Sequence, residues 1–493
     1  MRWPGTEQVT ALAEELDQRI AGGQRFAALL GRGNPATGTV LSALVAHDGG
    51  VTPLSAQLPA GVTHYPSLTP QLPAAFWYER LIHDLVGLVP DGHPRLDPLV
   101  LPHREGGELP HPGAAGRPAR IEPDERALPV EVHGPGLFTI PHGPVRSGVF
   151  ESVEYLVETP GEDIPHVRIR PHAKHRGLQK RFEGLDVDDG VLLAERVEGV
   201  ASVAHALAFA HAVERRAPLP QAAGLVRALH AECERIANHL DVLGKLADAA
   251  GLAVAAARFG LHKERVLRLV GALCGSRFGR GVVVPGGVSG LPRLPADAVS
   301  NELDRLQRGI DGDVRALCDT PSFLDRVRTT GPLAPDLAAA HGALGPVGRG
   351  SGCADDARVT RPYDAYRWLA PPLVPVRRAG DAQARMQVRI AEIETSFHLA
   401  HHAVGDLADC DTDTLATELE LSAGRSVGWA EAPQGEVVYL LEIGADGRIC
   451  YCAPRSASLH NLVLFPATFV GDILTDFPFN EASFGLSIAG VVM

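Results

Sequence analysis

A stretch rich in proline and glycine divides the chain and sets its domain organisation. Residues 104–129 contain nine Gly or Pro among 26 residues. Apolar residues have no regular spacing there, which is typical of a linker or an extended arm. The chain of 493 residues is also too long for one ordinary domain. The sequence therefore predicts a small domain over residues 1–103, a linker over 104–129 and a large domain over 130–493.

Helix and strand patterns follow one another in the small domain. We expect a helix over Val9–Gly22, a strand over Thr39–Ala46 and an aromatic-rich helix over Ala75–Val86. Together these elements predict a small α/β domain.

Helices dominate the pattern of the large domain. Apolar residues spaced three and four apart predict long helices over Leu225–Leu246, Val299–Leu317 and Met386–Ala400. Val149–Val157 alternates as a strand does, and a Gly-containing loop between Val437–Ile443 and Arg448–Cys452 indicates a hairpin. The predicted fold class is α+β, with a small α/β domain followed by a large, mainly helical domain that has added antiparallel strands.

Charge and apolar content exclude several classes of function. Asp and Glu number 59 against 46 Lys and Arg, and the net charge of −13 disfavours nucleic acid or an anionic membrane as the main partner. The best apolar run, Val200–Val213, has 14 residues and includes two histidines, whereas a membrane span needs about 20 residues. The N-terminus lacks the apolar segment of a signal peptide. We therefore expect a cytoplasmic protein.

Familiar cofactor motifs are absent from the sequence. It has no G-x-G-x-x-G after a strand, no Walker loop and no H-E-x-x-H, and its seven cysteines form no C-x-x-C pair. The glycine-rich stretch Gly345–Gly352 fits no phosphate loop, so we interpret it as backbone that passes close to another segment. A basic segment, His166–Gly177, precedes charged residues next to the apolar helix. This arrangement favours a partly buried polar pocket, with a solvated basic face as the alternative.

The small domain resembles the 30-kDa subunit of respiratory complex I. The signature of that subunit is W-Y-E-R-x-x-x-D-L-x-G followed by G-H-P. Residues 65–103 contain both parts, as WYERLIHDLVG and as GHP. The match is long and specific.

The large domain resembles the 49-kDa subunit of complex I and the large subunit of membrane-bound NiFe hydrogenases of the formate-hydrogenlyase type. Matching segments follow the family order and, with the small domain, extend over most of the chain. They are IPHGPVRSG (140–148), HRGLQK (175–180), ERVEGVASVAHALAFAHAVE (195–214), RALHAECERIANHL (227–240), GPVGRGSG (345–352), RPYDAY (361–366), QVRIAEI (387–393), EAPQGE (431–436) and DFPFNEASFGLS (476–487). The resemblance implies a hydrogenase-large-subunit-like fold, and a fusion of the two subunits is a known arrangement in this family.

Other residues stand where NiFe hydrogenases bind their metals. Those enzymes use four thiolates, from an R-x-C-G-x-C and a D-P-C-x-x-C motif. The matching positions here are Glu198 and Ala201 in the first motif, and Ser487 and Gly490 in the second. Because a site that selects thiolates cannot form from these residues, we expect no Ni–Fe site and no metal on this chain.

Complex I uses the vacated cavity to bind the quinone headgroup, and this chain matches that pattern in part. Glu198 and His142 agree with it, whereas the quinone-binding tyrosine falls on Leu193. The resemblance implies catalytic roles for Glu198, His142 and Arg196, and cofactor-binding roles for His175, Arg176, Arg349 and Ser487.

Two contacts are also expected around this cavity. Because Arg196 does not share a helix face with Glu198, a basic residue of the His175–Arg176 segment is the expected partner of Glu198. The face around Arg349 is expected to be covered by another protein of the complex.

The expected function is that of a large subunit in a membrane-associated, complex I-like redox complex without a Ni–Fe site. Such a complex couples electron transfer to the handling of protons or ions. The implied partners are an iron–sulphur small subunit with a 4Fe–4S cluster and antiporter-like membrane subunits, which hold the chain at the cytoplasmic face of the membrane. Two alternatives stay open: a C/D-type subunit of NADH-quinone oxidoreductase that binds quinone, and a scaffold without redox chemistry.

Overall fold

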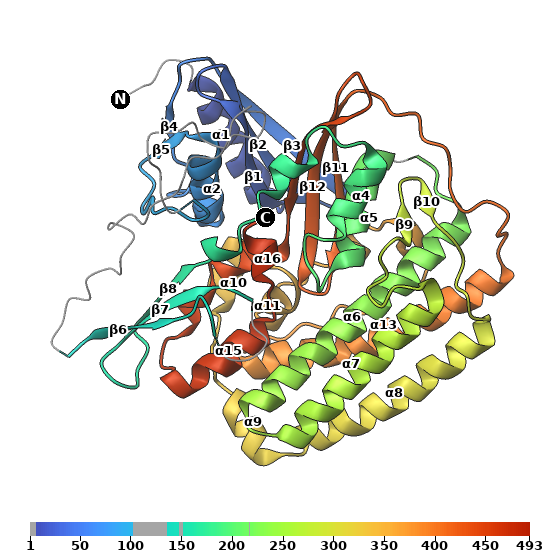
Figure 1. Cartoon of the computed structure of the whole chain (residues 1–493). Coiled ribbons are helices and arrows are strands. Elements are labelled where there is room, and N and C mark those ends of the chain that lie inside the picture. The colour runs from blue at the N-terminus through green and yellow to red at the C-terminus, as the bar shows by residue number, and fades with distance from the viewer. Residues whose placement is uncertain (1–5, 102–135, 147–150, 216) are drawn as a thin grey trace.

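The computed structural model describes residues 6–101, 136–146, 151–215 and 217–493. The predicted linker over 104–129 lies outside these residues. Figure 1 shows a small N-terminal sheet with its helices beside a large body of long helices. This arrangement confirms the α+β fold class.

The N-terminal part combines a three-stranded antiparallel sheet with two helices. Its elements are α1 (Glu7–Ala21), β1 (Arg25–Asn34), β2 (Gly38–His47), β3 (Gly50–Leu58), β4 (His64–Pro66), α2 (Phe76–Val86) and β5 (Val89–Asp91). The strands β1, β2 and β3 pair in chain order, and the short strands β4 and β5 pair in parallel. Both predicted helices and the predicted strand are confirmed here, since helical spacing turns Val9, Leu12 and Leu16 of α1 toward the core.

Long helices form the body of the larger part. They are α5 (Ser202–Glu214), α6 (Gln221–Ala249), α7 (Ala253–Cys274), α8 (Ala296–Cys318) and α13 (Ala382–Asp409). α6 packs against both α7 and α13, and one hydrophobic core extends through all five helices. The three long helices expected from apolar spacing are α6, α8 and α13, and each extends beyond the residues that its apolar spacing marks.

Shorter elements connect this body. The helices are α3 (Leu178–Phe182), α4 (Val187–Ala194), α9 (Pro321–Val327), α10 (Pro335–His341), α11 (Gly345–Gly350), α12 (Ala357–Thr360), α14 (Ala457–Leu462), α15 (Phe477–Phe484) and α16 (Ile488–Val491), with 3-10 turns η1 (Pro73–Ala75), η3 (His172–Lys174), η4 (Asp364–Arg367), η5 (Phe465–Thr468) and η6 (Leu474–Asp476). The interpretation of Gly345–Gly352 as closely approached backbone holds, because a Cβ at Gly345 would lie 2.0 Å from the carbonyl oxygen of Gln434.

Three further antiparallel sheets belong to the larger part. They contain β6 (Phe138–His142), β7 (Glu154–Thr159) and β8 (His166–Arg170); β9 (Val283–Val284) and β10 (Gly287–Val288); and β11 (Gly424–Ala432), β12 (Gly435–Ile443) and β13 (Ile449–Arg455). The predicted hairpin is β12–β13. The strand expected over Val149–Val157 begins later, at Glu154, and pairs with β6 and β8.

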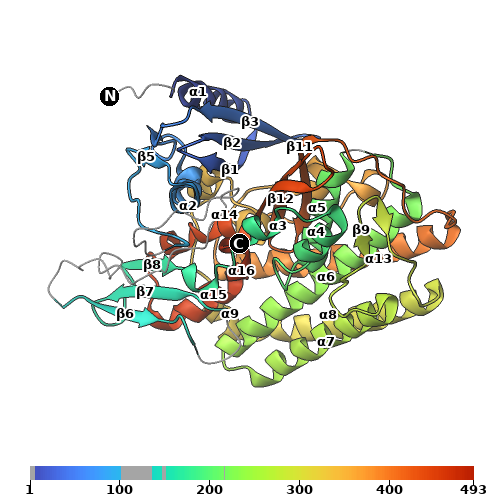
Figure 2. The same cartoon turned by 45° about the horizontal axis from the view of Figure 1, so that its top comes forward.

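The N-terminal sheet packs on the larger part through a shared core. Tyr78 of α2 donates a hydrogen bond to the Ala27 carbonyl and lies 3.2 Å from Nδ1 of His460 in α14. Arg25 of β1 forms ion pairs with Asp355 and Glu436. Figure 2 shows the strands β1–β3, β11 and β12 on the side of the molecule away from α7 and α8. The seven cysteines are all free.

No helix within the described ranges is long and apolar enough to cross a bilayer.

Candidate functional site

The turn between α4 and α5 carries Glu198 into the protein interior. The side chain of Glu198 is only 1% exposed. Neither of its carboxylate oxygens has a hydrogen-bond partner among the described residues. Burying a charged carboxylate without a donor is costly, so this group calls for a functional explanation.

The carboxyl group of Glu198 fills space next to the C-terminal helix α16. A Cβ placed on Gly490 would lie 1.3 Å from Oε1 of Glu198 and 2.6 Å from Oγ of Ser456. The hydroxyl of Ser456 donates to the Gly490 carbonyl at 3.0 Å. Position 490 therefore has no room for a side chain while Glu198 stays where it is.

A histidine and a tyrosine continue from Glu198 into the core. Nε2 of His205, which lies in the first turns of α5, is 3.8 Å from Oε1 of Glu198. Nδ1 of the same ring lies 2.8 Å from the hydroxyl of Tyr439 on β12. Burial raises the pKa of Tyr439 well above its usual value, so this hydroxyl keeps its proton. The three side chains form a buried row, and Nε2 of His205 has no hydrogen-bond partner in the described part of the chain.

Basic and polar side chains fasten the C-terminal segment over this row. Arg176 donates to the carbonyl oxygens of Val197 at 2.5 Å and Ala489 at 3.0 Å. Oγ of Ser487 donates to Oε1 of Glu151 at 2.8 Å, and Nδ1 of His175 lies 3.2 Å from the Val492 carbonyl. Burial lowers the pKa values of both Arg176 and His175.

The structure brings together four of the seven residues predicted for the site. Glu198, His175, Arg176 and Ser487 surround α16. The expected pairing of Glu198 with the His175–Arg176 segment is not found, because the donors of Arg176 bind backbone carbonyls. The nearest basic group to Glu198 is His205 instead.

Arg196 and His142 lie apart from this group. The Arg196 side chain is 53% exposed and donates to the Leu192 carbonyl. His142 ends β6, where its ring packs against the edge of the Phe477 ring at 5.5 Å between centroids. Burial, together with the nearby Arg146, lowers the pKa of His142.

Arg349 belongs to a separate network of buried charges. Its guanidinium forms ion pairs with Asp356 at 3.1 Å, Glu392 at 2.8 Å and Glu431 at 3.0 Å. The expectation that Arg349 lies on a face awaiting another protein is wrong, because this side chain is fully buried within the chain itself. Three acidic partners offset the cost of burying it.

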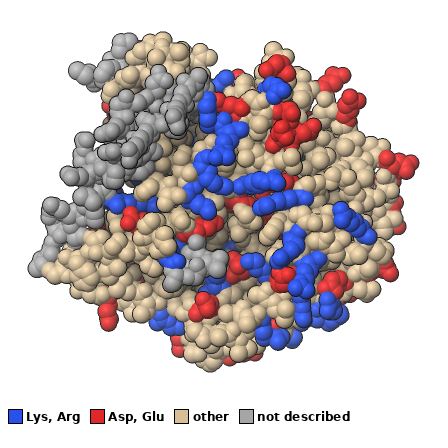
Figure 3. Space-filling view, viewed as in Figure 1, with Lys and Arg blue, Asp and Glu red and all other residues tan. Residues whose placement is uncertain are grey.

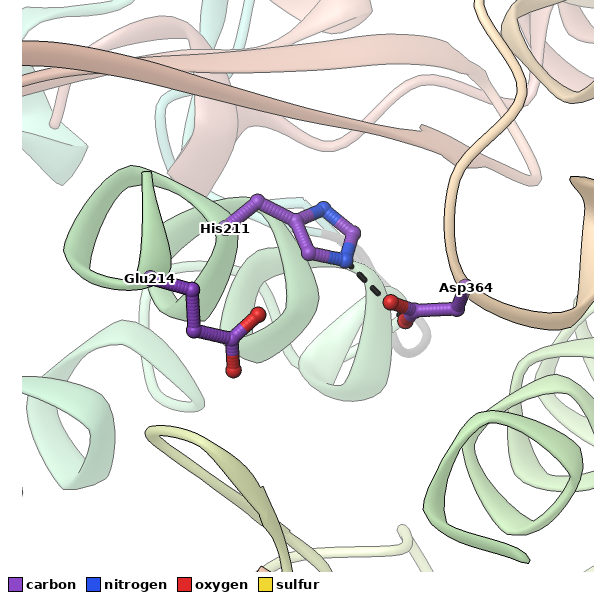
Figure 4. Close-up of side chains that lie close together, drawn as sticks. All are labelled: His211, Glu214 and Asp364. Atoms are coloured by element: carbon purple, nitrogen blue, oxygen red, sulfur yellow. Dashed lines mark hydrogen bonds and ion pairs between the residues drawn. The ribbon is translucent and has the colours of Figure 1, made fainter. Parts of the chain in front are cut away.

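A second cluster has the composition of a metal site. Ligand atoms of His211, Glu214 and Asp364 lie within 4.8 Å of one another (Figure 4). However, the buried guanidinium of Arg227 lies 2.6 Å from Glu214 and 3.4 Å from Asp364. The cluster already contains its cation, so we interpret it as an ion-pair network.

An open cleft of about 700 Å³ has Val200 and Ile488 in its wall, each two residues from Glu198 or Gly490. Its walls include Tyr155, Arg146 and Glu481, and also Asp241 of α6. The hydroxyl of Tyr155 donates to Oε1 of Glu481 at 3.0 Å, and Arg146 binds Oε2 at 2.8 Å. Figure 3 shows Lys and Arg side chains in a band across the middle of the face that Figure 1 presents.

Comparison with known proteins places the chain among respiratory and hydrogenase subunits. The family model of the 30-kDa subunit of respiratory-chain NADH dehydrogenase matches residues 10–115, and that of the 49-kDa subunit matches residues 254–418. The chain belongs to the fused 30-kDa/49-kDa family of complex I and hydrogenase subunits. It is thus a member of a family of oxidoreductase subunits.

Relatives of this fused family come from both branches. Formate hydrogenlyase subunit 5 of Escherichia coli (strain K12) is 28% identical over 442 residues, which cover 86% of this chain and 76% of that protein. The alpha subunit of the membrane-bound hydrogenase of Pyrococcus furiosus is 28% identical over 68% of this chain and 83% of its own length. The fused C/D subunit of the NADH-quinone oxidoreductase of Rhodopseudomonas palustris (strain BisA53) is 28% identical over 81% of this chain and 76% of its own length.

Several residues of the site escape sequence reasoning. The sequence displays His205 only as a polar residue in an apolar run, and its contact with Tyr439 joins positions 234 residues apart. Tyr155 has a signal as one face of an alternating strand, but nothing in that pattern assigns it to a cleft wall.

Proposed function

We propose that this fused-family protein is the large subunit of a membrane-associated, complex I-like redox complex that has no Ni–Fe site. In it, electron transfer is coupled to proton handling at Glu198. The observation that carries the proposal is the buried carboxyl of Glu198, which lacks a hydrogen-bond partner in the described residues and fills the space at Gly490.

The side chains at the four former ligand positions do not fit a Ni–Fe group. They offer one carboxylate and one hydroxyl, from Glu198 and Ser487, and no thiolate. Nickel with iron in such a site requires soft sulphur ligands. The hydroxyl of Ser487 is also bound to Glu151. A metal mechanism therefore has no support from these residues.

The row of Glu198, His205 and Tyr439 supports proton handling. Tyr439 binds Nδ1 of His205, so Nε2 is the ring atom that faces Glu198. The gap of 3.8 Å between Nε2 and Oε1 is longer than a hydrogen bond, and a small movement of either side chain would close it. A proton can then pass between the carboxyl of Glu198 and the imidazole of His205.

The proposed partners are an iron–sulphur small subunit with a 4Fe–4S cluster and antiporter-like membrane subunits. The cleft offers a surface for the small subunit near the former metal-ligand positions, because its wall includes Val200 and also Glu151, which binds Ser487. The relatives are named as subunits of larger assemblies, and the assembly of the Pyrococcus furiosus relative is membrane-bound. The chain is then peripheral, held at the cytoplasmic face of the membrane through its complex.

Quinone binding in the same cleft is a second candidate function. The tyrosine of the complex I pattern falls on Leu193, which packs in the core. Tyr155 supplies a hydroxyl at the cleft wall instead, next to Arg146. A quinone carbonyl in the cleft would meet the Arg146 guanidinium, and the Tyr155 hydroxyl would turn from Glu481 to donate to it.

The substitution Glu198→Gln tests the proposal in the purified complex. The shape of the side chain is kept and its ability to exchange a proton is lost, so turnover should fall by about 10²-fold or more while assembly stays intact. Glu195→Gln is the matched control, because Glu195 lies in the same turn but binds the Gly281 amide. Reduced methyl viologen and a short-chain quinone serve as electron donor and acceptor.

Two outcomes would contradict the proposal. Wild-type turnover of Glu198→Gln between about pH 6 and pH 8 would refute proton handling by Glu198. If the wild-type complex transferred no electrons to any acceptor, the scaffold alternative would stand. Loss of quinone reduction in Tyr155→Phe, with viologen oxidation by other acceptors kept, would support the quinone site.

A further inference from the structure

A side pocket of about 80 Å³ lies between α6 and α7, next to the Glu198 turn. A space of this size holds several water molecules. Four residues line both this pocket and the larger cleft, so the two spaces adjoin. They are Val200, Asn238, Asp241 and Lys263.

Glu234 of α6 is part of the wall of the side pocket. Its carboxylate accepts hydrogen bonds from the amides of Val203 at 2.7 Å and Ala204 at 3.1 Å. These amides belong to the first turn of α5. The N-cap residue of this helix is Ala201, whose side chain provides no cap. Protein atoms pack closely around Glu234, yet part of its surface faces the pocket.

Two further polar groups of the pocket wall have no protein partner within the described ranges. They are Nε2 of His230, whose Nδ1 lies 2.9 Å from the Val226 carbonyl, and Oδ1 of Asn238. His230 is 2% exposed and Asn238 is 6% exposed. Buried polar atoms of this kind are normally satisfied by ordered water, and the pocket has room for it.

We propose that Glu234 is a second proton-exchanging carboxyl. It gives its proton to water in the side pocket and is reprotonated by water that enters from the cleft. The amides of Val203 and Ala204 hold the carboxylate after the proton leaves. Water returns a proton through the opening at Asp241 and Lys263, which form an ion pair of 2.8 Å at the surface. The role of this exchange in turnover rests on the function proposed above.

The charges around Glu234 are compatible with exchange near neutral pH. Burial raises the pKa of Glu234 to about 8, while the two amides and Arg235 lower it and Glu198 raises it. The other titratable or charged groups of the pocket wall are His230, Cys233, Asp241, Lys263 and Arg277. Glu234 is therefore mostly protonated at pH 7, and it releases its proton as the pH rises through about 8.

Infrared difference spectroscopy of the resting, purified complex tests the exchange directly. The wild type should have a carbonyl band of a protonated carboxylic acid that disappears with a midpoint near pH 8. The band should be missing in Glu234→Gln and kept in Glu264→Gln, which removes a partly exposed carboxyl of the neighbouring helix α7. A band that Glu234→Gln leaves in place would overturn the proposal, as would the absence of any band titrating above about pH 6.

Glu234→Asp provides a second variant that keeps an ionisable group. Its shorter side chain should move the midpoint of the band, and an unmoved midpoint would count against the assignment. The resting titration needs no turnover, so it separates the two proposals. If Glu198→Gln keeps full activity while the Glu234 band behaves as expected, only the proposed function fails. If the band does not respond to Glu234, only this inference fails.

Discussion

The contact between Glu198 and Gly490 leads to a quantitative prediction for the substitution Gly490→Ala. Alanine would place its Cβ 1.3 Å from Oε1 of Glu198 and 2.6 Å from Oγ of Ser456. Glu198 must then move, although it is buried on all sides. Gly490→Ala should therefore destabilise the protein, and Glu198→Ala should relieve that effect.

Three contributions set the size of the effect. An extra methyl group in a well-packed site costs about 1–3 kcal/mol. Losing the hydrogen bond from Ser456 to the Gly490 carbonyl adds about 1 kcal/mol. Because Gly490 lies within α16, alanine regains up to about 1 kcal/mol of helix propensity. The net cost of Gly490→Ala is about 1–3 kcal/mol, and it should shrink by at least about 1 kcal/mol in the Glu198→Ala background.

Equilibrium urea unfolding followed by circular dichroism measures this coupling. The wild type, both single variants and the double variant form a double-mutant cycle. Gly199→Ala is the control, because a Cβ there meets no atom within 4 Å. If the unfolding costs of Gly490→Ala and Glu198→Ala add up to that of the double variant to within about 0.5 kcal/mol, the reasoning is refuted. Glu198 would then not occupy the space at Gly490.

Other predictions concern the two buried ion networks. Arg349→Met should lower the free energy of unfolding by about 3–5 kcal/mol because it removes the guanidinium that pairs with Oε1 of Glu392 and Oε1 of Glu431, and a loss below about 1 kcal/mol in urea unfolding would contradict this. Burial raises the pKa of Asp364, but His211 and Arg227 lower it to about 2, below the ordinary value of about 3.9. The carboxylate of Asp364 therefore stabilises the fold above its ordinary pKa, so the destabilisation by Asp364→Asn should shrink as the pH falls toward about 2 in acid-unfolding curves. A destabilisation that does not change with pH would argue against this ion pairing. Chelators should leave the thermal midpoint unchanged, because Arg227 already supplies the positive charge in that cluster.

The main helices follow from sequence because their apolar spacing is a local property. The apolar residues that predict α6, α8 and α13 repeat at the helical period over several turns; α8 buries this single stripe, whereas α6 is buried on nearly all sides. The hairpin β12–β13 is local for the same reason. The start of β7 does not follow from local sequence, since the pairing of β7 with β6 and β8 decides where the strand begins.

The site depends instead on contacts between distant segments, which spacing does not reveal. Family motifs point to Glu198, but the position of its neighbour His205 depends on the direction in which α5 leaves the turn. The burial of Arg349 depends on acids supplied by three other segments. A single sequence displays the charge of Arg349 without its partners, so the side chain resembles an exposed one.

Nickel content of the purified complex tests the central claim most directly. Inductively coupled plasma mass spectrometry should find no stoichiometric nickel, because Glu198, Ala201, Ser487 and Gly490 supply no thiolate. A formate hydrogenlyase complex prepared in the same way is the positive control. Nickel in a stoichiometric amount that survives dialysis, and that is lost in Glu198→Gln, would contradict the account.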